Sequence, residues 1–211
     1  MSIRPDSEET RENAARVVAS GGVIAFRTDT FYGLGANPLN AKAVQRIRAI
    51  KGRDEGKPIL LLIGELREVK RLTEFEPPLF RVIATHLWPG PLTIVLPAIK
   101  ALSYEVTVGS GSIGLRLPDE DSLRELLMTC GGALTATSAN PSGSEPATSA
   151  LQVAEYFPTG IDLIIDGGVV TTTQPSTVID VTSDPPRIIR EGAISKTELE
   201  AISGLIFDVG G

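Results

Sequence analysis

Five consecutive aliphatic residues, Ile59–Ile63, form the longest unbroken aliphatic run in this chain, and they lie between Pro58 and Gly64. A short apolar run bounded by turn-forming residues is typical of a strand that is buried on both faces. A strand is buried on both faces when helices cover both sides of its sheet, as in folds where helices and strands alternate along the chain. Helical and strand-like segments alternate through most of this sequence. The sequence therefore predicts an α/β fold around an internal sheet.

The spacing of apolar and turn-forming residues sets the expected elements. Helices are predicted over residues 6–20, 41–50, 77–88, 122–130 and 148–157. Strands are predicted over residues 23–26, 59–63, 93–97, 113–117, 133–137, 163–165, 177–181 and 187–189. Asp6 with Glu9 resembles a capping box for the first helix, and Asn40 is the expected N-cap of the second. Because no helix is predicted between the last three strands, part of the sheet is expected to be antiparallel.

Composition argues against several classes of protein. With one cysteine, Cys130, the chain can form no internal disulfide, and with one histidine, His86, a structural zinc site is not expected. We expect His86 to be a packing or surface residue. A net charge of −6 argues against a wholly basic nucleic-acid-binding surface but leaves room for a local basic patch. The charged N-terminus and the lack of a long apolar stretch predict no signal peptide, no membrane span and a cytoplasmic protein.

Polar and charged residues recur at the ends of the predicted strands. They are Thr28–Thr30, Lys51–Arg53 with Lys57, Ser112 with Arg116, Thr135–Asn140, Pro175–Thr177 and Arg190. Each cluster alone is more often a turn or a helix end than a binding site. Together they indicate a site for phosphates or a carboxylate, because ligands bind at strand ends of open α/β sheets and arginine and lysine bind anions. Arg116 is the clearest case, since it stands in an apolar strand where its charge needs a partner or a ligand.

The sequence contains neither of two common nucleotide-binding motifs, the dinucleotide-binding glycine loop and the P-loop. Residues 109–114 match the glycine spacing of a dinucleotide-binding loop, but a strand rather than a helix is predicted after them. Lys57 is followed by Pro58 instead of Ser or Thr, so the chain lacks a P-loop. A nucleotide would therefore have to bind through a different arrangement of residues.

Eight segments along the chain resemble the YrdC/TsaC family, the threonylcarbamoyl-AMP synthases. They are TDTFYGLG (28–35), IKGRDEGKP (50–58), LWPGPLTIVLP (87–97), SIGLRLP (112–118), TATSANPSG (135–143), DGG (166–168), PSTVID (175–180) and IIREGAIS (188–195). They occur in the family's order and spacing, and the resemblance covers about residues 10–197. It implies one domain over residues 1–211, with a twisted, mixed parallel and antiparallel sheet flanked by helices around a large, concave, basic cavity.

The resemblance also implies an activity. Family members form threonylcarbamoyl-AMP and pyrophosphate from L-threonine, bicarbonate and ATP, and Mg²⁺ accompanies the ATP through its phosphates without protein ligands. The product feeds the t6A modification at position 37 of tRNAs that read ANN codons, through a downstream tRNA threonylcarbamoyl transferase complex. A weak interaction with RNA is compatible with a basic cavity, and no membrane partner is implied.

The family's motifs can be carried over residue by residue. Its KxR and SxN pairs would supply the catalytic residues Lys51, Arg53, Ser138 and Asn140. ATP would be bound by Arg53, Lys57, Ser112, Ser138 and Arg190. Threonine would be bound by Thr30, Arg116, Ser176 and the backbone of Ala136. Asp29 is left open between a structural turn and a role in orienting a lysine or Mg²⁺.

The chain departs from the family pattern at three positions. Arg27 replaces the proline that usually precedes the TDT segment, so it changes the loop or adds a charge at the cavity rim. Leu62 stands where some members have histidine, which predicts a more apolar threonine side. Pro146 stands where a small polar residue often meets ATP, so that contact is left open. We expect the short, single-domain form, without the extra C-terminal domain of the longer family branch.

Two other functions stay open. A related carbamoyl-adenylating domain occurs inside larger hydrogenase-maturation proteins, but this chain has neither the acylphosphatase nor the zinc-finger region that accompanies it. A non-catalytic RNA-binding module is disfavoured by the net charge of −6 and by the lack of an RRM or KH signature. Dependence on carbamoyl phosphate would mark the first function, and salt-sensitive RNA binding that ignores threonine would mark the second.

Overall fold

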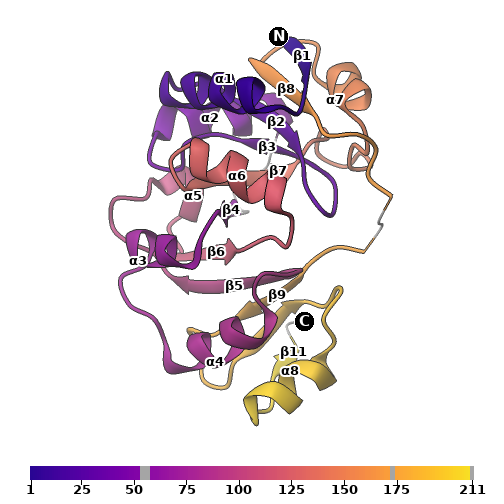
Figure 1. The fold of residues 1–211 in the computed structure, drawn as a ribbon. Helices are drawn as coiled ribbons and strands as arrows, with labels where there is room; N and C mark the ends of the chain where they lie inside the picture. The colour runs from indigo at the N-terminus through magenta and orange to yellow at the C-terminus, as the bar shows by residue number, and fades with distance from the viewer. Residues whose placement is uncertain (53–57, 172–173, 210–211) are drawn as a thin grey trace.

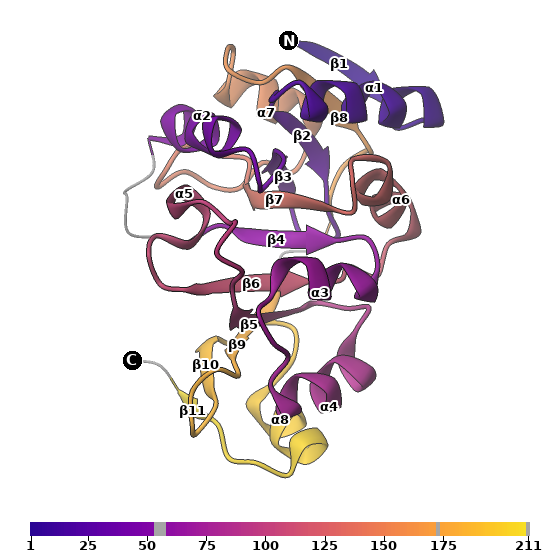
Figure 2. The same ribbon diagram turned by 90° about the vertical axis from the view of Figure 1, so that its left-hand side faces the viewer.

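The computed structural model describes residues 1–52, 58–171 and 174–209. Within these ranges the strands form an 11-stranded sheet in the order β1-β8-β2-β3-β7-β4-β6-β5-β9-β10-β11 (Figure 1). The strands are β1 (Ser2–Pro5), β2 (Ile24–Arg27), β3 (Tyr32–Gly35), β4 (Leu60–Ile63), β5 (Leu92–Pro97), β6 (Ser112–Arg116), β7 (Ala133–Ser138), β8 (Leu163–Asp166), β9 (Thr177–Asp180), β10 (Arg187–Arg190) and β11 (Asp208–Val209). Figures 1 and 2 show them stacked from β1 and β8 at one end of the molecule to β9, β10 and β11 at the other.

The helices lie between these strands along the chain, as the sequence predicts. They are α1 (Glu8–Ala19), α2 (Ala41–Lys51), α3 (Val69–Leu72), α4 (Pro78–Leu87), α5 (Tyr104–Thr107), α6 (Asp121–Thr129), α7 (Ala150–Tyr156) and α8 (Lys196–Ser203), with a 3-10 turn at Leu66–Glu68. Every predicted helix and strand is present, and each ends within two residues of its predicted bounds. Strands β1, β3 and β11 and helices α3, α5 and α8 were not predicted from the sequence.

The predicted capping of the first helix is wrong, whereas that of the second is confirmed. Ser7, not Asp6, is the N-cap of α1, and its side chain accepts a hydrogen bond from the Thr10 backbone N–H at 3.3 Å. Asp6 lies outside the helix and pairs instead with the side chain of Arg11 at 2.7 Å. At α2 the Asn40 side chain accepts from the Ala43 N–H at 3.2 Å, as expected for an asparagine N-cap.

Strand pairing confirms the mixed sheet. The pairs β1–β8, β2–β8, β4–β6 and β5–β9 are parallel. The pairs β2–β3, β3–β7, β4–β7, β5–β6 and β9–β10 are antiparallel. The predicted antiparallel part therefore includes β9 and β10, but it also runs through the middle of the sheet.

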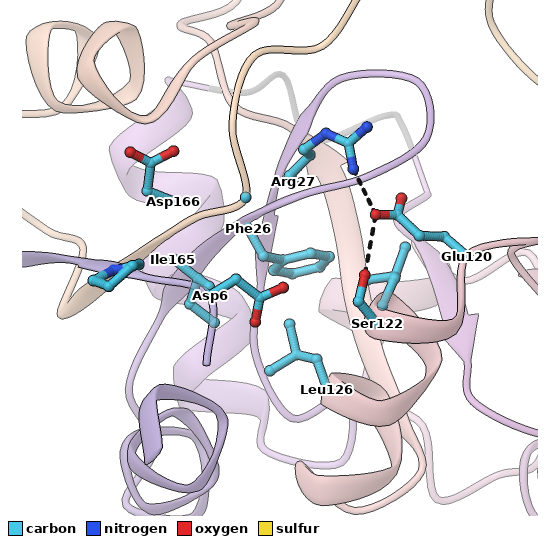
Figure 3. A pocket seen from close by; sticks show the side chains of 11 residues that line it. Asp6, Phe26, Arg27, Glu120, Ser122, Leu126, Ile165 and Asp166 are labelled. Atoms are coloured by element: carbon cyan, nitrogen blue, oxygen red, sulfur yellow. Dashed lines mark hydrogen bonds and ion pairs between the residues drawn. The ribbon is translucent and has the colours of Figure 1, made fainter. Parts of the chain in front are cut away.

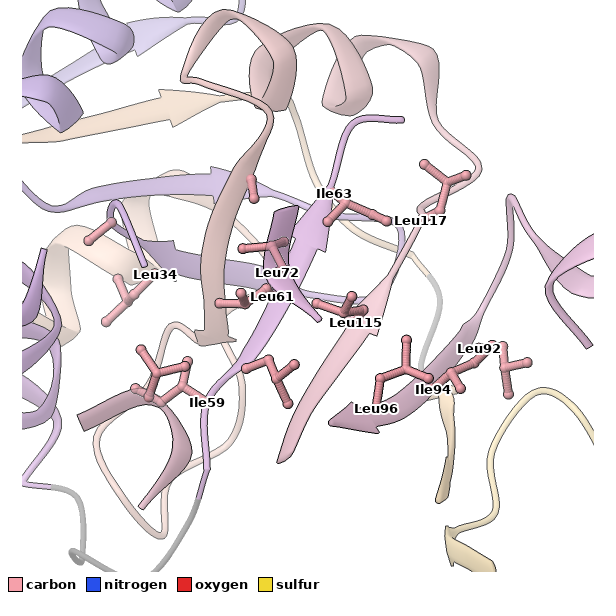
Figure 4. Packing of buried hydrophobic residues seen from close by; sticks show 14 of the residues in the cluster. Leu34, Ile59, Leu61, Ile63, Leu72, Leu92, Ile94, Leu96, Leu115 and Leu117 are labelled. Carbon is pink, nitrogen blue, oxygen red and sulfur yellow. The ribbon is translucent and has the colours of Figure 1, made fainter. Parts of the chain in front are cut away.

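Side chains alternate between two apolar clusters, one on each face of the sheet. The larger cluster includes Leu61, Ile63, Ile94 and Leu115 of the central strands, and Figure 4 shows these side chains packed together. Helices α2, α3, α4, α7 and α8 contribute buried residues to this cluster. Both faces of β4 are buried apart from partly exposed Leu60, which confirms the interpretation of the aliphatic run.

The smaller cluster lies on the opposite face, beneath α1 and α6. Helix α1 packs against β2 and β8, and α6 packs against β4 and β7. This cluster includes Leu62 of β4 and Ala136 of β7 together with Leu123, Leu126 and Leu127 of α6. Strands β6, β5 and β9 continue the same face of the sheet beyond α6, and this part of the face forms the floor of a cavity.

Candidate functional site

A cavity of about 600 Å³ lies over this part of the sheet. Residues two apart on successive strands point into it, since alternate side chains of a strand share one face. These pairs are Leu60 and Leu62, Thr93 and Val95, Gly114 and Arg116, Ala136 and Ser138, and Ser176 and Val178. The loop between β2 and β3, together with Pro146, Ile189 and Arg190, adds to the lining. One sheet face thus provides an apolar floor with hydroxyl groups and two guanidinium groups set into it.

Thr28 fixes the loop that borders the cavity between β2 and β3. Its hydroxyl accepts hydrogen bonds from the backbone N–H groups of Thr30 and Phe31, at 3.2 and 3.1 Å. The same hydroxyl lies 2.6 Å from the Phe31 carbonyl oxygen, to which it donates. This local bonding is typical of threonine in turns and holds Thr30 at the cavity wall.

Arg116 is the most deeply buried charge of the cavity. Its residue is 3% exposed, its Nε donates to the Gly90 carbonyl at 3.1 Å, and its Nη2 donates to Asp29 Oδ2. Burial lowers the pKa of the guanidinium, the charge and hydrogen bond of Asp29 raise it, and nearby Arg190 lowers it again. Arginine stays protonated under all these influences, so a full positive charge is held at the cavity wall.

Arg190 and Ser176 form a second polar group in the cavity. Arg190 Nη2 donates to the Ser176 carbonyl at 2.8 Å and to the Ser176 hydroxyl at 3.1 Å. The Ser176 hydroxyl also lies 3.3 Å from the hydroxyl of Thr93. Partial burial lowers the pKa of Arg190. Hydroxyl and guanidinium donors gathered on an apolar floor suit a small anionic ligand.

Lys51 and Asn140 stand behind the cavity wall rather than in it. Lys51 is 5% exposed at the end of α2, and its Nζ donates to the backbone carbonyl of Ser138. Asn140 donates through Nδ2 to the carbonyls of Pro141 and Ser144, at 3.0 and 2.6 Å. Its Oδ1 is buried and has no partner among the described residues. Both side chains thus support the segment that carries Ser138.

The structure brings together most of the candidate residues. Those that line the cavity are Thr30, Arg116, Ala136, Ser138, Ser176 and Arg190. Ser112 shares a strand face with Arg116 but is not among the lining residues, and its hydroxyl donates to the Ser110 hydroxyl at 3.1 Å. Arg53 and Lys57 lie outside the described residues. The expected basic character of the cavity as a whole stays a prediction, although the charged residues in its described lining are both arginines.

Leu62 and Pro146 line this cavity, whereas Arg27 does not. Arg27 lines a second, smaller cavity of about 270 Å³, where it forms an ion pair with Glu120 (Figure 3). His86 is exposed on α4 with Nδ1 2.8 Å from the Val82 carbonyl, so it is a surface residue, as expected. Thr93 was not predicted as a site residue, although a polar residue in a strand of otherwise apolar residues is a signal that could have identified it.

Two further features of the described residues bear on function. Across residues 1–52, 58–171 and 174–209, no helix has the length and apolar character needed to cross a membrane. In the same ranges, no three His, Cys, Asp or Glu side chains gather closely enough to hold a metal ion.

The fold and the cavity together define an α/β protein with a mixed sheet and a recessed cavity whose described lining includes two arginines and several hydroxyl groups. The family model Sua5/YciO/YrdC, described as telomere recombination, matches residues 16–192, and the chain belongs to this family. The resemblance found in the sequence is therefore confirmed.

Relatives with assigned names share this fold over most of the chain. A threonylcarbamoyl-AMP synthase from Pyrococcus abyssi is 38% identical over 98% of this chain and 61% of its own length. One from Thiobacillus denitrificans is 35% identical over 86% of this chain and 96% of its own length. A crystal structure of P. abyssi Sua5 complexed with L-threonine is 36% identical, has a TM-score of 0.91 and covers 99% of this chain and 61% of its own. The chain thus spans under two thirds of one relative and nearly all of another, and its assignment to the short form stays a prediction.

Proposed function

We propose that this protein is a threonylcarbamoyl-AMP synthase, which forms threonylcarbamoyl-AMP and pyrophosphate from L-threonine, bicarbonate and ATP. The observation that carries the proposal is the buried guanidinium of Arg116 at a cavity in a member of this family. A carboxylate is the natural partner of such a group, because a fork of guanidinium N–H groups matches its two oxygens. The relative whose structure contains L-threonine supports the same assignment.

In this proposal the cavity has a threonine side and an ATP side. Arg116 binds the threonine carboxylate, with Thr30, Ser176 and the backbone of Ala136 beside it. Ser138 and Arg190 bind ATP, together with Ser112 and with Arg53 and Lys57, which lie outside the described residues. The exposed hydroxyl of Ser112 is the contact that the geometry supports least, since it lies apart from the described lining. Leu60, Leu62 and Val95 give the floor its apolar character.

The reaction needs positioning and charge neutralisation more than a protein nucleophile. Bicarbonate carboxylates the threonine amine to an N-carboxylate, and water is released. One carboxylate oxygen then forms a bond to the α-phosphorus of ATP, while the bond from that phosphorus to the bridging oxygen breaks and pyrophosphate leaves. Ser138 and Arg53 are proposed to stabilise the charge that accumulates on the phosphates, with Lys51 adding its positive charge from behind Ser138 and Asn140 holding the Ser138 segment in place.

Mg²⁺ is proposed to bind together with ATP. No carboxylate is among the described residues that line the cavity, so the phosphates rather than the chain would hold the ion. The ion would neutralise phosphate charge and so help pyrophosphate to leave. The product would pass to a tRNA threonylcarbamoyl transferase complex for t6A formation in the cytoplasm.

Pyrophosphate release from ATP tests the function when threonine and bicarbonate are omitted one at a time. We expect release that requires both substrates. Release that requires carbamoyl phosphate instead would favour the carbamoyl-adenylating function. A folded protein that releases none and binds RNA with a steep dependence on salt would favour the RNA-binding function.

Gly114 keeps the cavity floor open, and enlarging this residue is expected to weaken substrate binding. A Cβ at this position would lie 3.1 Å from Thr93 Cγ2, and further methyl groups would project into the cavity. We expect Gly114→Val to raise the KM values for threonine or ATP about tenfold or more while the sheet stays folded, because the added methyl groups would fill space in the cavity that a substrate needs. Gly114→Ala is the graded control and should have a smaller effect. Wild-type KM values in the valine variant would contradict the position of the cavity.

A further inference from the structure

Two ion pairs join the β2–β3 loop to the segment that runs from β6 into α6. Asp29 of the loop pairs with Arg116 at the end of β6. Arg27 at the end of β2 pairs with Glu120 just before α6, as Figure 3 shows. Strands β2 and β6 are not neighbours in the sheet, because β3, β7 and β4 lie between them. The two pairs differ in surroundings, since Arg116 faces the larger cavity and Arg27 the smaller one.

The carboxylate of Asp29 forms an ion pair with Arg116 and has no other hydrogen-bond partner among the described residues. Its Oδ2 accepts the hydrogen bond from Arg116 Nη2, and its Oδ1 is buried with no partner among the described residues. A turn role for this carboxylate has no support, because the hydroxyl of Thr28 makes the bonds that close the loop. A buried carboxylate oxygen without a hydrogen bond costs free energy, so stability alone does not account for this pair.

Two of the three guanidinium nitrogens of Arg116 have hydrogen-bond partners, and the third has none among the described residues. Nε bonds the Gly90 carbonyl, Nη2 bonds Asp29, and Nη1 has no hydrogen-bond partner among the described residues. The Gly90 carbonyl alone would leave the guanidinium able to rotate about its stem. The positive charge of Arg190 repels that of Arg116, so the guanidinium would be pushed away from this position if the charge of Asp29 were removed by substitution.

We propose that Asp29 is a positioning residue that holds the Arg116 guanidinium with its unpaired edge toward the cavity, ready for the substrate carboxylate. The inference deepens the proposed function and rests on it, because it assumes that Arg116 receives the carboxylate of threonine. Asp29 acts through Arg116 and makes no contact of its own with the substrate. This assigns it neither to a turn nor to the orientation of a lysine or Mg²⁺, the roles that the sequence left open.

The test is Asp29→Asn, which keeps the shape of the side chain and removes its charge. We expect the KM for threonine to rise about 10- to 100-fold, as for the loss of a charged hydrogen bond, with the KM for ATP within about twofold of wild type. Asp29→Glu retains the charge and should recover part of the loss. Glu120→Gln is the matched control: it removes the ion pair of Arg27, the residue of β2 that directly precedes the same loop, and should leave the KM for threonine within about twofold of wild type.

Calorimetric titration of L-threonine, in the presence of a non-hydrolysable ATP analogue, separates this inference from the proposed function. If wild type binds threonine but releases no pyrophosphate, the proposed function fails, and weaker binding by Asp29→Asn still supports the positioning role. Unchanged threonine binding in Asp29→Asn overturns the inference alone. Equal rises in both KM values with a lowered melting temperature also overturn it, since they indicate a structural role. A folded wild type that binds no threonine overturns both.

Discussion

The Arg116→Gln variant is expected to lose about 10²- to 10³-fold in kcat/KM for threonine. The change removes a positive charge that is 3% exposed, at a residue that lines the cavity and whose Nη1 has no hydrogen-bond partner among the described residues. A charge-assisted, two-pronged contact with a carboxylate is lost, and glutamine can offer one neutral N–H in its place. Steady-state kinetics of pyrophosphate release with threonine as the varied substrate measure the loss.

The effect of Arg116→Gln on stability can be measured separately from its effect on activity. Arg116→Gln leaves the Asp29 carboxylate without its partner, so the free energy of unfolding should also fall, by about 3–5 kcal/mol for a buried pair broken on one side. The double variant Asp29→Asn with Arg116→Gln removes both charges and should regain most of that stability while activity stays low. Arg27→Gln is the matched control outside the cavity. Near-wild-type kinetics in the double variant would rule out Arg116 as the carboxylate-binding group.

Replacing Lys51 by methionine is expected to lower kcat for pyrophosphate release about 10²- to 10³-fold. The Nζ group donates to the Ser138 carbonyl, directly behind a residue that lines the cavity. Methionine fills a similar volume but carries no charge, so the phosphates lose a nearby cation and the Ser138 segment loses a buried hydrogen bond.

Lys42→Met supplies the control for this change, because Lys42 is exposed on the same helix α2. We expect it to keep wild-type kinetics. Circular dichroism and melting temperature report whether the helix survives in both variants. A folded Lys51→Met protein with wild-type kcat would remove Lys51 from the proposed chemistry.

The elements predicted from the sequence are those whose apolar residues repeat over at least a full strand or several helical turns. Strand β3 (Tyr32–Gly35) was missed because two of its four residues are glycines, which weaken any strand pattern. Strand β1 (Ser2–Pro5) is polar and pairs at the sheet edge with β8, far along the chain. Helices α3 and α5 have four residues each, too few for a helical repeat to be recognised.

The candidate site was predictable as a set of residue types but not as an arrangement. The argument that Arg116 needs a partner or a ligand in an apolar strand holds, and the structure supplies Asp29 and the Gly90 carbonyl as partners. Neither partner is adjacent in sequence, so no local pattern could identify them. The same limitation explains why Lys51 and Asn140 were grouped with Ser138, although they support the segment of Ser138 from behind.

The lining of the larger cavity is drawn from residues as far apart in the chain as Thr28 and Arg190. Strand β9, next to which Arg190 lies, must also pair with β5 before that wall exists. During synthesis on the ribosome, the site therefore cannot begin to close until about nine tenths of the 211 residues have been made. A nascent chain arrested earlier would leave the Arg116 face of β6 and the apolar floor beside it without this wall, and substrate could not cover them.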